Sequence, residues 1–175
     1  QDNVSHDLMT FCSLLTSWYL TNHPQKAQRS RRILELMMKY YHYSHAHPTN
    51  TTAAADTGAD LLRNAQTMVI SACAYLVPIK SATTNEEALC IATQTYKEIQ
   101  NPNPRTYVTY IQALHHLEKE SAQKRKKIEE VFKEYCAASN CMNKKSRIED
   151  SVVLEKLIPI LSPTQYKTLL LILKR

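Results

Sequence analysis

The 175-residue chain contains a single glycine, Gly58. Phosphate-binding loops and dinucleotide-binding turns need glycine where the backbone approaches the ligand, so these nucleotide-binding motifs are excluded. Folds built from tight β-hairpins are disfavoured as well, because their turns prefer glycine at fixed positions. No apolar run approaches the roughly 18 residues that a transmembrane helix requires. The sequence therefore predicts a protein without a membrane span.

The five cysteines include no C-x-x-C pair, and their number is odd. Both features argue against a disulfide framework and against a zinc knuckle. Free cysteines in apolar helical segments behave as small hydrophobic side chains, which suits a reducing compartment. The sequence also shows no catalytic set of residues. We therefore predict no metal, no cofactor, no small-molecule substrate and no enzymatic activity.

Basic residues outnumber acidic ones, with 22 Lys and Arg against 16 Asp and Glu, which gives a net charge of +6. This balance suits an anionic partner such as nucleic acid, although solubility alone explains it equally well. One basic group, at 26–32, either contacts phosphates at the edge of a groove or lies solvated at the start of a helix. The other basic groups lie at 124–127 and 144–147.

Apolar residues recur every three or four positions along most of the chain, which indicates amphipathic helices. Breaks fall where Pro residues interrupt the periodicity, because the residue before a proline disfavours the helical conformation. The predicted helices cover 8–20, 25–43, 64–76, 85–100, 105–117, 122–138, 149–158 and 163–173.

Helix starts are marked by residues that cap free backbone N–H groups. Thr84 or Asn85 is the predicted N-cap of one helix, and acidic residues just after it complement the positive helix end. Ser162 followed by Pro163 predicts another start, since proline is favoured at the first helical position. Between two helices, residues 44–60 are rich in His, Thr, Ala and Asn and hold few large apolar side chains. This segment is predicted to be a mobile connector.

The predicted helices pair into hairpins in which Phe11, Gln66 and Tyr107 occupy equivalent places in the first helices. One such hairpin cannot bury its own apolar face, so the pairs must stack side by side. The predicted fold is all-α, a short right-handed α-solenoid of about three helical hairpins with two C-terminal capping helices. The hairpins cover 8–43, 64–100 and 105–138, and the cap covers 149–173.

The first helices resemble those of the pentatricopeptide repeat (PPR) family, which read roughly V-T-Y-N-T-L-I after a proline. Residues 104–114 (PRTYVTYIQAL) are similar to this motif, and residues 64–74 and 9–18 match parts of it. The second helices also look similar to the family's, and the arrangement resembles the long-repeat PPR proteins of algal organelles. The resemblance covers nearly the whole chain apart from the connector.

The resemblance implies single-stranded RNA as partner, in a mitochondrion or plastid, with one base read per repeat along a groove lined by the first helices. The family reads each base with the residue after the first-helix aromatic position and with the last residue of the repeat. Carried over, the base-reading candidates are Cys12 (paired with Leu62), Thr67 (paired with Asn103) and Val108. The phosphate-contact candidates are Arg63, Arg105 and Thr106.

Two functions remain open at this stage. The first is an organellar RNA-binding protein that acts in transcript processing, stability or translation. The second is a PPR-derived structural subunit of a large organellar protein or ribonucleoprotein assembly, held mainly by contacts with other protein subunits. The family and the positive charge favour the first. The second is favoured because only one pair, Thr67 with Asn103, resembles a good reader, here of adenine.

Overall fold

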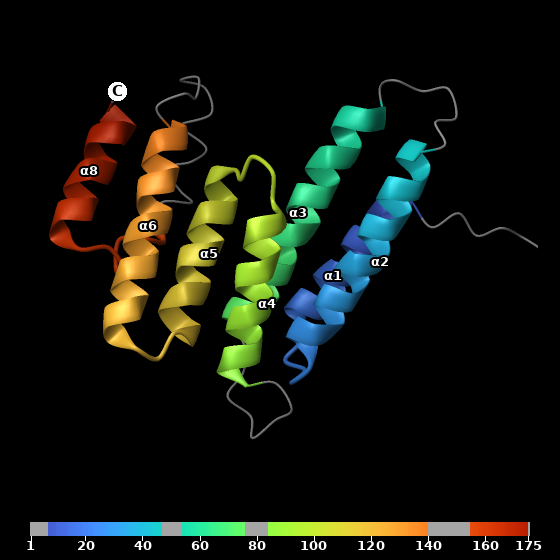
Figure 1. Ribbon diagram of the computed structural model, residues 1–175, viewed down its shortest axis with the longest axis horizontal. Helices are drawn as coiled ribbons and strands as arrows, with labels where there is room; N and C mark the ends of the chain where they lie inside the picture. The colour runs from blue at the N-terminus through green and yellow to red at the C-terminus, as the bar shows by residue number, and fades with distance from the viewer. Residues whose placement is uncertain (1–6, 47–53, 76–83, 140–154, 175) are drawn as a thin grey trace, which may run out of the picture.

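The computed structural model describes residues 7–46, 54–75, 84–139 and 155–174 (Figure 1). Every regular element in these ranges is an α-helix, which confirms the all-α prediction. None of the described helices combines the length and the apolar character needed to span a membrane. The helices are α1 (Leu8–Leu20), α2 (Lys26–Ala46), α3 (Ala54–Ala74), α4 (Asn85–Glu98), α5 (Pro104–Leu117), α6 (Ser121–Ser139) and α8 (Pro163–Lys174).

The predicted connector at 44–60 is wrong at both of its ends. Helix α2 continues to Ala46 and α3 already begins at Ala54, while residues 47–53 lie outside the described part of the chain. Alanine is the strongest helix former, and the segment before Gly58 contains several alanines. A Cβ at Gly58 would lie 3.0 Å from a ring carbon of Tyr41. This close packing of α3 on α2 extends the helix into a stretch that composition alone describes as polar loop.

The predicted helix caps at Thr84 and at Ser162 are confirmed. The Thr84 hydroxyl accepts the Glu87 N–H at 3.1 Å, and the Glu87 carboxylate accepts the Thr84 N–H at 3.0 Å. Ser162 and Gln165 make the same reciprocal pair before α8. Such pairs satisfy backbone donors that have no partner inside the helix. The preceding helix, predicted at 149–158, lies mostly outside the described residues, and residues 155–161 form hydrogen-bonded turns.

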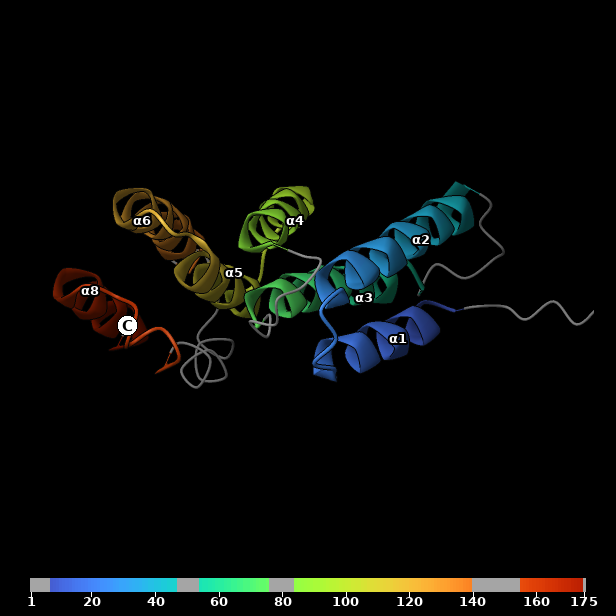
Figure 2. The ribbon, with the colours of Figure 1, turned by 90° about the horizontal axis from the view of Figure 1, so that it is seen from below.

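The helices form an elongated row with α1 and α2 at one end and α8 at the other (Figure 1). Seen from below, α1 and α3 lie towards one face of the row and α2 and α4 towards the other (Figure 2). Helix α3 is central, since it packs against α1, α2, α4 and α5. The first helices α1, α3 and α5 therefore lie next to one another, in the order of the chain.

Two apolar cores stabilise this row, and α3 contributes to both. Val69 packs with Leu15, Leu34 and Met37 in the core between α1, α2 and α3. Its neighbour Ile70 faces the other way, into a core that extends through α4, α5 and α6. Adjacent residues on a helix point about 100° apart, so one helix can serve both sides. A hairpin removed from this row would expose one face of a core.

The basic group at 26–32 lies at the start of α2 and is largely committed to contacts within the chain. The Arg31 guanidinium binds the Glu98 carboxylate of α4, and Arg29 lies 6.0 Å from the ring centre of Trp18. These contacts argue against phosphate binding by Arg31, and its paired, 13% exposed side chain does not fit the alternative of a solvated helix start either.

Candidate functional site

Two adjoining pockets of about 210 Å³ each lie on the face shared by α1, α3 and α5. They share four lining residues, so they form one continuous depression, which we name the first-helix groove. Figure 2 shows these three helices following one another along the row. The lining residues are Thr16 and Tyr19 from α1; Asn64, Thr67, Met68, Ser71 and Tyr75 from α3 and its end; Arg105, Val108, Thr109 and Gln112 from α5; and Lys156.

The charges of the groove have one sign. Arg105 lines both pockets, Lys156 lines the second, and both side chains are exposed. No acidic residue is among those that line either pocket, and neither cation has an ion-pair partner within the part of the chain that the structure describes. Unpaired cations without nearby carboxylates attract an anionic ligand.

Two tyrosines give the groove an aromatic component. Tyr75 is 42% exposed, and its hydroxyl donates a hydrogen bond to Gln112 Oε1 at 3.2 Å. The His116 ring packs against the ring of Tyr75 in a T-shaped arrangement with centres 5.7 Å apart, and His116 hydrogen-bonds the Ala74 carbonyl. Burial, followed by the proximity of Tyr19, raises the pKa of Tyr75. The phenol is therefore neutral at physiological pH and can donate its hydroxyl hydrogen bond to Gln112.

The predicted reader pair Thr67 and Asn103 lies in one cluster with Thr106. The Asn103 side chain is the N-cap of α5, accepting the Thr106 N–H at 2.9 Å. The fully buried Thr106 hydroxyl lies 2.9 Å from Asn103 Oδ1 and 2.9 Å from the Thr67 hydroxyl. The sequence therefore placed the pair close together, but these polar atoms satisfy one another. Thr67 remains at the wall of the groove, whereas Asn103 does not line it.

Three other candidates for RNA contact do not face the groove or are already occupied, because they are buried or paired with another side chain. Cys12 is only 8% exposed and packs in the core of α1, α2 and α3, so its thiol does not face the groove. Its proposed partner Leu62 packs against the same core. Thr106 is fully buried and therefore does not reach a phosphate. Arg63 pairs with Asp60 at 3.0 Å and does not line the groove.

The structure places Arg105 and Val108 at the groove. Arg105 is exposed at the start of α5, where a phosphate can approach it. Val108 lines the second pocket, but it is almost fully buried and has no side-chain hydrogen-bonding atom. It therefore shapes the wall and cannot read a base by hydrogen bonding.

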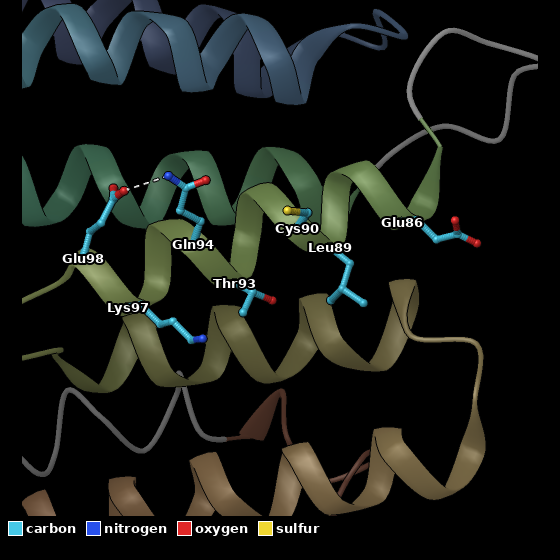
Figure 3. A pocket seen from close by; sticks show the side chains of 7 residues that line it. All are labelled: Glu86, Leu89, Cys90, Thr93, Gln94, Lys97 and Glu98. Carbon is cyan, nitrogen blue, oxygen red and sulfur yellow. Dashed lines mark hydrogen bonds between the residues drawn. The ribbon is translucent and has the colours of Figure 1, made fainter.

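The second-helix layer carries two further pockets with a different chemistry. The larger one, of about 560 Å³, is lined by α4 alone and includes Glu86, Lys97 and Glu98 (Figure 3). There Gln94 donates a hydrogen bond to Glu98 at 3.2 Å. The other, of about 440 Å³, lies between α2 and α4 and includes Glu35. In the first of these pockets, two carboxylates against one lysine disfavour an anion. The second also contains Arg31, Arg32 and Lys39, of which Arg31 is already paired with Glu35 and Glu98.

The sequence did not point to Tyr19, Tyr75, Gln112 or Lys156. These side chains come from three helices and from the turns before α8, and they meet only in the folded row. Only Gln112 could have been found from the sequence, because it lies one helical turn after the candidate Val108 and therefore on the same face of α5. Within the described residues, no group of three or more His, Cys, Asp or Glu side chains is arranged to hold a metal ion.

Comparison of the chain with family models, curated proteins and solved structures gives no match in any of the three. What the chain binds must therefore be inferred from its own residues.

Proposed function

We propose that the chain is an RNA-binding helical-repeat protein of the PPR type, with single-stranded RNA bound along the first-helix groove. One observation carries this proposal: among the described residues, the groove combines two cations without an ion-pair partner, two tyrosines, and hydroxyl and amide groups, and no carboxylate lines it. Single-stranded nucleic acid needs cations for its phosphates and aromatic faces for its unstacked bases. The groove offers both along one face.

The order of the helices supports the repeat architecture in this proposal. The first helices pack in sequence, α1 on α3 and α3 on α5, and each is followed by its own second helix. We take this row as a short right-handed α-solenoid of three hairpins with a C-terminal cap. The proposed role is transcript processing, stability or translation in a mitochondrion or plastid, as the PPR-like first helices imply.

The affinity is expected to depend on Arg105 through phosphate charge rather than through base identity. Neutralising one phosphate contributes about 0.7 to the slope of log affinity against log salt for a single strand. Replacing Arg105 by Ala should therefore weaken the binding of all RNA sequences alike and reduce this slope by about 0.7. Binding of labelled short homopolymers of U, A and C, measured at about 50 and about 200 mM salt, tests this expectation.

A matched control removes the same charge from the other layer. Arg32 is an exposed arginine of α2 that lines the pocket between α2 and α4. Replacing Arg32 by Ala should leave both affinity and salt slope close to those of the unmodified protein. An Arg105→Ala variant that binds every strand as the unmodified protein does would contradict binding in the first-helix groove. Negligible affinity of the unmodified chain for every strand would overturn the RNA-binding proposal.

A second candidate function, a PPR-derived scaffold subunit of an organellar assembly, is favoured by a different observation. Large apolar side chains are exposed on the outermost helices of the row, with Leu20 of α1 72% exposed and Leu171 of α8 63% exposed. Exposed apolar groups at interfaces contribute to association when they are covered. This candidate predicts no RNA affinity, and loss of assembly when Leu20 and Leu171 are replaced by Ser. Purifying the native complex and identifying what accompanies the chain distinguishes the two functions: RNA supports the first, and protein subunits without RNA affinity support the second.

A further inference from the structure

We infer that the pocket between α3, α5 and the turns before α8 is a binding site for one unstacked nucleotide of an RNA strand. In this site the phosphate lies between Arg105 and Lys156, and the base stacks on Tyr75. The inference rests on the proposed RNA binding and adds to it the place of one nucleotide. It also gives the C-terminal segment a part in binding, beyond capping the row.

The position of Lys156 is fixed by the residue that follows it. Leu157 is 1% exposed and belongs to the core that extends through α4, α5 and α6. Ile160 and Leu161 pack against the same core, and the Leu161 N–H donates to the Leu157 carbonyl at 3.0 Å. The segment is therefore anchored on the row, while the exposed Lys156 side chain lines the pocket.

Two cations from distant parts of the chain thus border one pocket. Arg105 belongs to the first turn of α5, and Lys156 to the turns before α8. Like charges that converge without a carboxylate between them repel each other, and a bound phosphate relieves that repulsion. An arginine adds planar, two-pronged recognition of phosphate oxygens, and a lysine adds a point charge.

Tyr75 is held in place before any ligand arrives. Its hydroxyl binds Gln112, and the ring packs edge-on against His116. A side chain that is already fixed loses little conformational entropy when a base stacks on it. The exposed part of the ring therefore provides a ready stacking surface.

The size of the pocket fits a segment of a polymer better than an enclosed small molecule. Its volume is about 210 Å³, whereas pockets that enclose drug-sized ligands measure about 300–1,000 Å³. The depression continues into the neighbouring pocket through Tyr19, Ser71, Arg105 and Thr109. A strand can therefore enter at one pocket and leave through the other.

The experiment locates the bound nucleotide directly. A short U-rich RNA that carries 5-iodouridine is cross-linked to the unmodified chain with ultraviolet light, and the modified peptides are identified by mass spectrometry. The expected cross-link is on Tyr75. Replacing Tyr75 by Leu should weaken binding by about five- to 150-fold, as for the loss of one stacked base. The Tyr75→Phe variant keeps the ring and should retain most of the affinity.

The lysine is tested in parallel by charge removal. Replacing Lys156 by Gln should reduce the salt slope by about 0.7. The matched control is Lys167→Gln, which removes an exposed lysine of α8 that does not line the pocket. If RNA binds but cross-links only at other residues, and Tyr75→Leu and Lys156→Gln bind normally, this inference is overturned and RNA binding stands. If the unmodified chain binds no RNA, both fail.

Discussion

The guanidinium of Arg31 and the carboxylate of Glu98 form a two-pronged ion pair between α2 and α4. Arg31 Nη1 donates to Glu98 Oε2 at 2.6 Å, and Nη2 donates to Oε1 at 2.8 Å. Arg31 also donates to the Thr95 hydroxyl and to Glu35. The two side chains are only 13% and 27% exposed, so water screens their attraction less than at the surface. This contact joins the second helices of neighbouring hairpins.

Replacing Glu98 by Gln should destabilise the protein by about 1–3 kcal/mol, because the partly buried Arg31 loses one of the two carboxylates that compensate its charge and keeps only the more exposed Glu35. Urea unfolding at neutral pH, followed by circular dichroism at a helix wavelength, measures the change. The control is Glu129→Gln, which breaks the exposed pair of Glu129 and Lys133 on α6. Its effect should be much smaller than that of Glu98→Gln, because solvent screens an exposed pair. Equal effects of the two substitutions would show that burial does not strengthen the Arg31 pair.

The same pair predicts a dependence of stability on pH. The hydrogen bond from Arg31, more than any other contact, lowers the pKa of Glu98 from its ordinary value of 4.5. A carboxylate with a lowered pKa stabilises the folded state fully above its unfolded pKa, and this contribution is lost as pH falls through the folded pKa. The difference in unfolding free energy between the unmodified chain and Glu98→Gln should therefore be constant at neutral pH. It should shrink below about pH 4.5. A difference that does not change down to pH 2 would contradict this assignment.

The cysteines differ in how far they are accessible. Burial raises the pKa of the Cys73 thiol to about 12, whereas Cys90 is exposed on α4. Only a thiolate reacts rapidly with an aromatic disulfide reagent, and a buried thiol is also shielded from it. In the folded protein at pH 8, Cys90 should react quickly and Cys73 only on unfolding. The comparison uses single-cysteine variants, and equal rates would show that α3 is not packed as described.

Helical periodicity was enough to predict most helices because each has an apolar stripe that faces the row. The predicted bounds of α1 agree with the structure, and those of α5 differ by one residue. The start of α3 could not be predicted in this way. Its first turns contain Ala and Thr without an apolar stripe, and its packing depends on the absence of a side chain at Gly58 beneath the Tyr41 ring. That contact is between helices, and no local pattern encodes it.

The candidate site was predicted only in part, for a related reason. The resemblance to PPR repeats gave Thr67 as a candidate, the start of a first helix gave Arg105, and both line the groove. The resemblance does not show how polar atoms pair across helices, so it predicts a base reader at Asn103, whose side chain caps α5. Lys156 was missed because it belongs to no repeat and reaches the groove only through the anchoring of Leu157.

The capping role of Asn103 gives a prediction that separates stability from recognition. Replacing Asn103 by Ala should destabilise the protein by about 1 kcal/mol, the usual cost of losing an N-cap. The Asn103→Ser variant keeps a capping oxygen and should recover most of this loss. If RNA binds, the affinity ratio between A and U homopolymers should be the same in Asn103→Ala as in the unmodified chain. A changed ratio with unchanged stability would restore Asn103 as a base reader.

Gln112 predicts which base the pocket prefers. Its Oε1 accepts the Tyr75 hydroxyl, and the amide NH₂ group, which has no partner among the described residues, is available to donate to a ligand. Uracil presents a carbonyl oxygen where cytosine presents an amino group, so the free donor favours uracil. We expect a U homopolymer to bind at least about five-fold more tightly than a C homopolymer, equivalent to about 1 kcal/mol of base discrimination.

The substitution that tests this preference is Gln112→Glu. The new carboxylate still accepts the Tyr75 hydroxyl, but towards the ligand it offers only acceptors, which pair with the cytosine amino group. The ratio of U to C affinity should therefore fall and reverse. The two polymers are both pyrimidines, so base size changes little between them, and added repulsion of phosphate by the carboxylate weakens both. A ratio that stays constant while both affinities fall would show that Gln112 positions Tyr75 without contacting the base.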